Sequence, residues 1–304
     1  MSRIGLVVNP TAGHGKGRAA GRQAHAGLVE AGHTVTDLSA PTLAQATDAA
    51  RAAVVSGLDA LLVVGGDGMT HLGVNVVAGT DLPLGIVASG SGNDIARWFG
   101  LPVHDVPAAL AVVDRGLADG PRQVDAAQVR AAGREAFEWY VGVLSCGIDA
   151  AVNARANRLR FPPGMGKYLR ALAAELVGYR PYGYRLVHDD VTEDFAGPLV
   201  AVANTGAFGG GIKIAPHACA DDAVLDVVWA GRLGLGRVLA LLPRLFTATH
   251  LRHPQVHTAT ARHVLIAPSP DQGPTPPVAY ADGERIGPLP LEVRLVPGAL
   301  HLLG

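Results

Sequence analysis

Two aspartates in this chain follow short apolar segments that end in glycine, an arrangement suited to phosphate chemistry. Asp67 stands in Gly65-Gly66-Asp67-Gly68, directly after the Leu/Val run at 61–64. Asp94 stands in a Gly/Ser-rich turn after a second apolar run at 84–88. Glycine lets backbone N–H groups approach a ligand, and open α/β sheets bind ligands at the carboxyl ends of their buried parallel strands. The two turns therefore predict one phosphate-binding cleft built from neighbouring loops.

A third loop near the beginning of the chain carries similar chemistry. Residues 9–17 read Asn-Pro-Thr-Ala-Gly-His-Gly-Lys-Gly and lie between an expected strand and an expected helix. Glycines, a lysine and a helix N-terminus can together cradle a phosphate. The segment is neither a Walker A motif, since Gly17 replaces Ser or Thr, nor Gly-x-Gly-x-x-Gly, which weakens a dinucleotide interpretation. Taken alone, it reads equally well as an ordinary strand-to-helix turn.

The elements that must position these loops alternate between strand and helix over the first 120 residues. The predicted strands are Ile4–Val8, Thr34–Leu38, Ala60–Val64 and Leu84–Ala88. The predicted helices are Gly17–Ala31, Thr42–Ser56, Thr70–Ala78, Asn93–Phe99 and Val106–Gly116. Thr42 can cap its helix and Gly57 can end it. This alternation predicts a parallel sheet with helices on both faces.

The pattern changes near Pro121 to mostly antiparallel β-structure. The predicted strands are Arg122–Val129, Glu138–Ser145, Tyr184–His188, Leu199–Ala203, Val224–Trp229, Val264–Ala267, Val278–Ala281 and Leu291–Val296, with helices Lys167–Val177 and Leu235–Leu245. We therefore predict an α/β nucleotide-binding domain at 1–121 and a β-rich domain at 122–304. The last strand could return to pack on the first domain.

Composition excludes several classes of protein. A hydrophobic fraction of 49% against 17% charged residues is typical of a globular chain, and a net charge of −1 gives no case for nucleic acid. Cys146 and Cys219 lie far apart, which argues against a disulfide framework or zinc site and for a reducing, cytoplasmic setting. No run of 18 apolar residues indicates a membrane span, and the segment before the first strand is too short for a signal peptide.

Four motifs occur in a defined order along nearly the whole chain. They are Asn-Pro-x-x-Gly at 9–13, Gly-Gly-Asp-Gly at 65–68, Gly-x-Gly-Asn-Asp-x-Ala-Arg at 90–97 and Asp-Gly-Glu at 282–284. Shorter matches surround Val124-Asp125, Cys146–Ala150 and Ala215–Val227. The ordered set resembles the diacylglycerol kinase catalytic-domain family, which includes sphingosine and ceramide kinases. This resemblance implies an α/β domain related to that of NAD kinases, a C-terminal β-sandwich domain, and ATP bound between them.

The resemblance also implies roles for individual residues. Glu284 would accept the proton of a lipid hydroxyl, and Asp67, Asp94 and Asp125 would form an acidic network that positions magnesium and the hydroxyl. Asp222 would hold a structural magnesium together with main-chain oxygens of Cys219 and Val224. The residues expected to line ATP are Asn9, Pro10, Thr11, Ala12, Gly13, Gly65, Gly66, Asp67, Gly68, Met69, Thr70, His71, Leu72, Ser91, Asn93 and Asp94.

Phosphoryl transfer requires residues of these types, but Glu284 and Asp222 can also be explained without a role in catalysis or binding. Phosphoryl transfer needs positioning and charge neutralisation, magnesium prefers carboxylate oxygens, and the acceptor hydroxyl needs a base. Without the resemblance, a solvated turn residue is the favoured interpretation of Glu284, and a surface charge beside Asp221 is a serious alternative for Asp222. Asp125 lies within an expected strand, so we expect a polar partner or a ligand for its carboxylate.

The chain departs from the family pattern at four positions. Members usually read Gly-Gly-Asp-Gly-Thr-x-x-Glu-Val, whereas this chain has Met69, Leu72 and Gly73 at the threonine, glutamate and valine. Ala223 replaces the usual glycine beside Asp222. If position 72 faces the cleft, the missing carboxylate predicts weaker binding of magnesium and nucleotide.

These observations together predict a cytoplasmic lipid kinase that uses ATP and magnesium. Diacylglycerol is the first choice of acceptor, presented at the inner membrane surface; a sphingoid base or another lipid is the alternative. NAD kinase and a weakly active nucleotide- or lipid-binding relative are the other classes. The apolar segment 233–246 could lie on a membrane, although a helix packed on the β domain is the favoured interpretation. The oligomeric state stays open, with a homodimer as one option.

Overall fold

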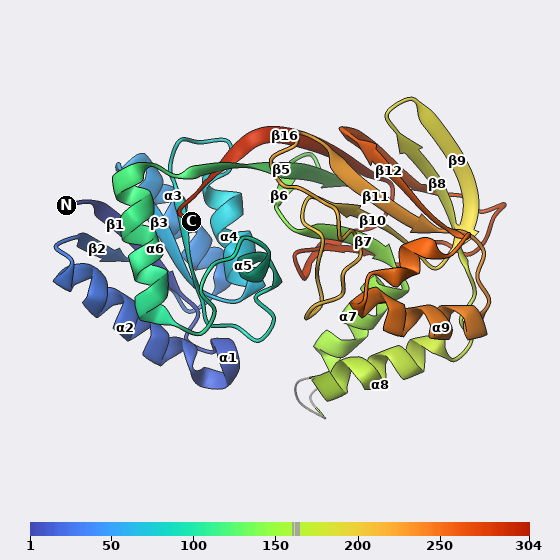
Figure 1. Cartoon of the computed structure of the whole chain (residues 1–304), viewed down its shortest axis with the longest axis horizontal. Helices are drawn as coiled ribbons and strands as arrows, with labels where there is room; N and C mark the ends of the chain where they lie inside the picture. Colours follow the sequence, from blue (N-terminus) through green and yellow to red (C-terminus); the bar gives the residue numbers. More distant parts are fainter. Residues whose placement is uncertain (160, 162–164) are drawn as a thin grey trace.

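The computed structural model describes residues 1–159, 161 and 165–304, which form two lobes joined by long strands (Figure 1). The first lobe contains a parallel sheet in the order β2-β1-β3-β4. Its elements are β1 (Arg3–Val8), α1 (Ala12–Gly15), α2 (Gly17–Glu30), β2 (Thr34–Asp37), α3 (Leu43–Val55), β3 (Ala60–Gly65), α4 (Asp67–Val77), β4 (Leu84–Ala88), α5 (Asp94–Trp98) and α6 (Val106–Asp119).

Alternate side chains of these strands enter two separate cores. On β3, Leu61 and Val63 join the core that also contains residues of α3 and α4, while Leu62 and Val64 join the core shared with α2 and α6. Helices therefore cover both faces, as predicted. The predicted N-cap is confirmed as well, because the Thr42 hydroxyl accepts a hydrogen bond from the Gln45 N–H at 3.3 Å.

The second lobe is mainly an antiparallel β-sandwich. Its elements are β5 (Arg122–Ala131), β6 (Glu138–Tyr140), β7 (Val143–Gly147), α7 (Ile148–Arg158), α8 (Met165–Leu176), β8 (Tyr182–His188), β9 (Val191–Gly197), β10 (Leu199–Ala203), β11 (Leu225–Ala230), α9 (Leu235–Phe246), the short helix η1 (Thr249–Arg252), β12 (Val256–Ala261), β13 (His263–Pro268), β14 (Ala279–Ala281), β15 (Glu284–Gly287) and β16 (Leu291–Leu302). One core, including Tyr140, Leu144 and Tyr184, fills the space between the two sheets. The fold class predicted from the sequence is confirmed.

The lobes share one continuous sheet. Its order is β2-β1-β3-β4-β16-β13-β8-β9, and β5 pairs along β16. At its end, β16 places Leu302 beside Leu84 in parallel pairing with β4. The second sheet has the order β12-β11-β10-β7-β14-β15 and carries the Asp-Gly-Glu motif at its β14–β15 hairpin.

Several predicted elements were wrong. The helix expected from Thr70 begins at Asp67, because the Met69 and Thr70 N–H groups both bond to the Gly66 carbonyl as soon as β3 ends. The strand expected over 138–145 is broken at Val141-Gly142, where the chain crosses from one sheet to the other. The elements α7, β9, β12 and β15 were missed, and α1 precedes the helix expected from Gly17.

Helix α9 presents apolar side chains to both protein and solvent. Val238 and Leu241 are buried, which confirms the packed-helix interpretation. Leu235, Leu239 and Phe246 are 41%, 45% and 53% exposed and recur at helical spacing on another stripe. Among the described residues, no helix has the length and apolar character needed to cross a membrane.

Candidate active site

Three loops meet backbone to backbone at the carboxyl ends of β1, β3 and β4. A side chain on Gly90 would place its Cβ 2.3 Å from Gly66 Cα, and one on Gly13 would lie 2.3 Å from the Ser89 carbonyl oxygen. The Gly90 N–H also bonds to the Gly65 carbonyl at 3.1 Å. Only glycine allows this approach, so the sequence prediction that neighbouring loops form one cradle agrees with the geometry.

Two polar residues of the predicted site hold the loops in shape. The Asn9 carboxamide oxygen accepts from the Thr11 N–H at 3.0 Å and from its hydroxyl at 2.8 Å. Asn93 has a left-handed backbone (φ 56°), and its side chain bonds to both the N–H and the carbonyl of Gly90. Ser91 is exposed at the tip of the same loop. Asn9 and Asn93 therefore stabilise the loop conformations of the cradle, whatever ligand it binds.

Asp67 and Asp94 lie together at the edge of the cradle. Asp67 Oδ1 accepts from the Ile95 N–H at 3.2 Å, and a Cβ on Gly92 would lie 2.7 Å from Asp67 Oδ2. Burial, with the nearby negative charges of Asp94 and Asp282, raises the pKa of Asp67 to about 6. Asp94 reaches into the second lobe, where its Oδ2 accepts from the Gly210 N–H at 2.7 Å.

Glu284 meets this cluster from the second lobe. It follows Asp282 and Gly283, the two left-handed residues (φ 53° and 86°) that form the β14–β15 turn. A Cβ on Gly68 would lie 2.6 Å from Glu284 Oε1, so the carboxylate sits directly against the first turn of α4. Glu284 and Asp67 therefore face the same space from two lobes.

The rest of the predicted motif on α4 turns away from that space. Met69, Thr70 and Leu72 are 4%, 3% and 3% exposed, and Met69 packs over Gly65. Leu72 belongs to the core beneath the sheet, which corrects the expectation that its side chain lines the nucleotide site. His71 is also buried, and its ring bonds to Asp282 and Glu138.

The carboxylate of Asp125 is hydrogen-bonded to backbone N–H groups. Its carboxylate accepts from the Ala223 N–H at 2.8 Å and from the Gly298 N–H at 2.7 Å, at 3% exposure. Among the described residues, no hydrogen bond joins Asp125 to Asp67 or Asp94. The expected polar partners are therefore backbone amides, and a share in the acidic network stays a prediction.

The predicted structural-metal loop is adjacent to Asp125. Asp222 Oδ1 accepts from the Val224 N–H at 3.2 Å, and Cys219 Sγ donates to Asp221 Oδ1 at 2.8 Å. Ala223 has φ 61°, a left-handed conformation that explains why glycine is usual there. Within the described chain no group of three or more His, Cys, Asp or Glu side chains could hold a metal ion. A site built from one carboxylate and two carbonyls remains a prediction.

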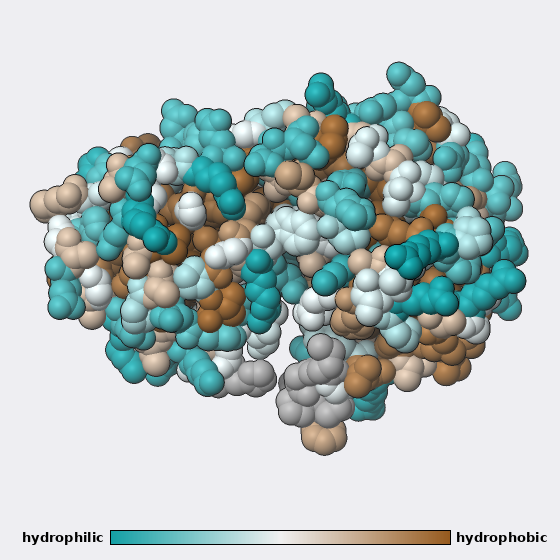
Figure 2. Space-filling model, viewed as in Figure 1, coloured by the Kyte–Doolittle hydropathy of each residue, from teal (hydrophilic) through white to brown (hydrophobic). Residues whose placement is uncertain are grey.

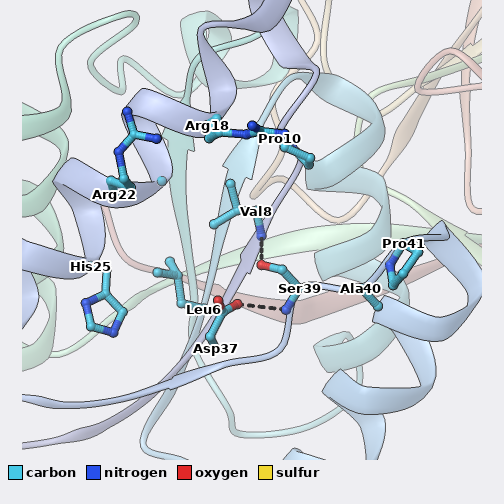
Figure 3. Close-up of a pocket in the computed structure, with 11 residues that line it drawn as sticks. Leu6, Val8, Pro10, Arg18, Arg22, His25, Asp37, Ser39, Ala40 and Pro41 are labelled. Atoms are coloured by element: carbon cyan, nitrogen blue, oxygen red, sulfur yellow. Dashed lines mark hydrogen bonds between the residues drawn. The ribbon is translucent and has the colours of Figure 1, made fainter.

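A pocket of about 660 Å³ opens beside the cradle at Pro10 (Figure 3). Arg18, Arg22 and His25 line it from one face of α2, and Asp37 and Ser39 line it from the end of β2. The Ser39 hydroxyl accepts from the Val8 N–H at 3.0 Å, and Asp37 accepts from the Ser39 N–H at 2.9 Å. Among the described residues that line it, Pro10 is the one that belongs to the predicted nucleotide site. The i, i+4, i+7 spacing of the three basic side chains was the available signal.

A second region lies under α9 in the other lobe. A small apolar pocket of about 60 Å³ is lined by Ile148, Leu199, Val228 and Leu241 among others. Asp149, the next residue after Ile148, is half-buried, and its two buried carboxylate oxygens have no hydrogen-bond partner among the described residues; burial raises the pKa of this carboxyl. One helical turn later, Asn153 donates to the Gly283 carbonyl at 3.3 Å, which connects α7 to the turn that carries Glu284.

Comparison with known proteins agrees with this architecture. Residues 3–129 match the diacylglycerol kinase catalytic domain, and residues 142–304 match the YegS C-terminal NAD kinase beta sandwich-like domain. A diacylglycerol kinase from Mycobacterium tuberculosis is 36% identical over 308 residues, covering 100% of this chain and 95% of the relative. One from Bacillus subtilis is 24% identical over 88% of this chain and 86% of the relative.

A structure of a diacylglycerol kinase from Bacillus anthracis str. Sterne has the same fold, with a TM-score of 0.72 at 17% identity, over 99% of this chain and 96% of that one. Fold, site and relatives define an ATP-dependent kinase that acts on an alcohol-bearing lipid. More particularly, the chain belongs to the diacylglycerol kinase catalytic-domain family.

Proposed function

We propose that this protein transfers the γ-phosphate of ATP to the hydroxyl of diacylglycerol, giving phosphatidic acid. The observation that carries the proposal is the contact of Glu284 with Gly68 beside Asp67. A base from one lobe then stands at the N-terminus of a helix in the other, where a phosphate group binds favourably.

The nucleotide half of the site follows from the cradle and its neighbouring pocket. Backbone N–H groups of the loops at Asn9–Gly13 and Gly65–Gly68 would hold the phosphates, and the pocket at Pro10 has the volume and basic side chains for the nucleoside end. Carboxylate oxygens at Asp67 and Asp94 fit a hard cation, and magnesium, when bound, neutralises charge on the phosphates. Asp222, with Cys219 and Val224, is the proposed second magnesium site.

The transfer step is assigned to Glu284. Its carboxylate takes the proton from the acceptor hydroxyl while the hydroxyl oxygen bonds to the γ-phosphorus. The bond from that phosphorus to the β,γ-bridging oxygen breaks, and ADP leaves with the electron pair. The proton passes from Glu284 to solvent afterwards, so the products are phosphorylated lipid, ADP and one proton.

The acceptor half of the site supports a lipid. The apolar pocket at Ile148, lined by side chains of the β-rich lobe and of α9, suits an acyl chain. The exposed stripe Leu235, Leu239 and Phe246 on α9 adds apolar surface to the same lobe (Figure 2). We infer that this stripe meets the membrane surface that presents the substrate.

The test is incubation of the purified protein with γ-labelled ATP and magnesium. Diacylglycerol, monoacylglycerol and sphingosine are supplied in mixed micelles, and NAD is supplied in solution. We expect label in phosphatidic acid above all. Label in sphingosine phosphate would move the acceptor to a sphingoid base, and label in NADP would overturn the lipid assignment.

A further inference from the structure

His71 is a buried histidine that joins the two lobes. It lies on α4, one helical turn after Asp67, and is 6% exposed. Its Nδ1 lies 3.2 Å from Asp282 Oδ2 and its Nε2 lies 3.1 Å from Glu138 Oε1. Both partners belong to the β-rich lobe. A carboxylate offers only acceptors when ionised, so both ring nitrogens must donate, and the ring fits here as an imidazolium.

The buried carboxylate of Asp282 is stabilised by the positive charge of His71. Its side chain is fully buried, and it also accepts from the Gly142 N–H at 2.8 Å and the Val141 N–H at 3.2 Å. A buried carboxylate with neutral donors alone carries an uncompensated charge, which is strongly unfavourable. The His71 imidazolium is the positive partner within hydrogen-bond distance among the described residues.

The turn held by these contacts carries Glu284. Asp282 is the first of the two left-handed residues of the β14–β15 hairpin, and Glu284 is the first residue after the turn. Holding Asp282 against α4 fixes where the hairpin lies, and the hairpin sets where the Glu284 carboxylate meets Gly68. A neighbouring contact also joins α4 to the second lobe, because the Asn75 side chain on α4 bonds to both the N–H and the carbonyl of Trp139 on β6.

We propose that His71 is a positioning residue whose imidazolium clamps the Asp282–Glu284 hairpin onto α4 and so sets the approach of Glu284 to the phosphate cradle. The role assigned to Glu284 rests on the proposed function. The clamp itself does not, because it is a property of the folded chain before any ligand binds.

The clamp should weaken when His71 loses its proton, and the charged groups around His71 set the pH at which this happens. Burial alone would lower the pKa of His71, but its hydrogen bonds to Asp282 and Glu138 outweigh burial and raise the pKa to about 9. The charged and titratable groups on the surrounding elements are Asp67 on its own helix, Glu138 and Tyr140 on β6, Arg134 bonded to Glu138, and Asp282 and Glu284 in the hairpin.

The first experiment compares His71→Ala with His33→Ala. His33 is a matched control, since it also bonds to a carboxylate, Asp114, at 3.1 Å, but within the first lobe. In His71→Ala we expect kcat to fall by about 10²-fold, typical of a displaced catalytic group, with the Kd for ATP changed less than about twofold. Hydrogen exchange of the peptide covering 279–287 should accelerate in His71→Ala and not in His33→Ala.

The second experiment uses Glu138→Gln, which keeps a hydrogen-bond acceptor for His71 and removes one charge. In the parent we expect kcat to fall as pH rises through about 9, because His71 then loses the proton that holds the hairpin. In Glu138→Gln, both the pH at which the His71 ring titrates by NMR and the pH at which kcat falls should move lower. A His71 ring that is neutral at pH 7, or a hairpin whose exchange is unchanged in His71→Ala, would overturn the clamp. These two readouts need no substrate, so they separate failure of the clamp from failure of the proposed function.

Discussion

Replacing Leu72 by the glutamate usual in the family should destabilise this protein in a pH-dependent way. Leu72 is 3% exposed in the core beneath the sheet. The next residue, Gly73, confirms how closely α4 packs there, because a Cβ on it would lie 2.6 Å from Leu84 Cδ1. A carboxylate at position 72 would therefore enter a space that now holds hydrocarbon.

The magnitude has two parts that can be measured separately. Loss of the leucine's apolar burial should cost about 1.5–3 kcal/mol and is common to Leu72→Glu and Leu72→Gln. Only the glutamate must also be kept neutral. If burial raises its pKa by about 3 units above the unfolded value of about 4.3, the variant loses a further ~4 kcal/mol once the pH reaches about 8. That is a large share of the roughly 5–15 kcal/mol that stabilises most proteins.

The sign of the pH dependence follows from the proton count. The pKa is raised in the folded state, so above about pH 4.3 the unfolded chain has lost a proton that the folded chain keeps, and stability falls as pH rises to the folded pKa. Asp67 and His71 titrate in every variant, so each variant is compared with the parent at the same pH. Urea unfolding at pH 5 and pH 8 should then give nearly the same loss of free energy of unfolding at both pH values for Leu72→Gln and a much larger loss at pH 8 for Leu72→Glu. Equal behaviour of both variants at pH 8 would refute the reasoning and place position 72 at the cleft.

Three further predictions follow from the site. Glu284→Gln should lower kcat by about 10²–10⁴ with little change in ATP affinity by calorimetry, and loss of affinity at unchanged kcat would make Glu284 a nucleotide or metal ligand. Because the pKa of Asp67 is raised to about 6 and its ionised form is the useful one, kcat/KM should fall as pH drops through about 6, a limb that Asp67→Asn should lack. Ala223→Gly should raise the free energy of unfolding by about 0.5–1 kcal/mol, since left-handed alanine is strained, whereas Ala52→Gly, at a solvent-exposed position of α3, should lower it.

The cradle could be predicted because its signals are local. An apolar run, two glycines and an aspartate follow one another within β3 and the start of α4, and chain order alone brings parallel strand ends to one edge. The helix start was misplaced by three residues because Gly66 ends the strand and accepts the first helical hydrogen bonds at once. No loop separates the elements, so composition gave no boundary.

The clamp could not be predicted, because its partners are distant in sequence. His71 and Asp282 are separated by 211 residues, and nothing near either residue indicates the other. The apolar pocket at Ile148 was missed for a related reason, because Ile148 lines it from helix α7, which the sequence did not predict. A sequence shows which residues can do chemistry, but the second lobe must be folded against the first before their neighbours are known.

The need of Asp125 for polar partners could be predicted from its place in a strand, but the identity of those partners could not. A carboxylate between Val124 and Ala126 had to find polar partners, and that inference was correct in kind. Its partners are N–H groups 98 and 173 residues away, and one of them belongs to Ala223, the residue that departs from the family pattern. The Ala223 departure thus falls on a strained backbone position and the Leu72 departure on the core. Both are therefore expected to act first on stability, so neither substitution by itself argues against catalysis at Asp67 and Glu284.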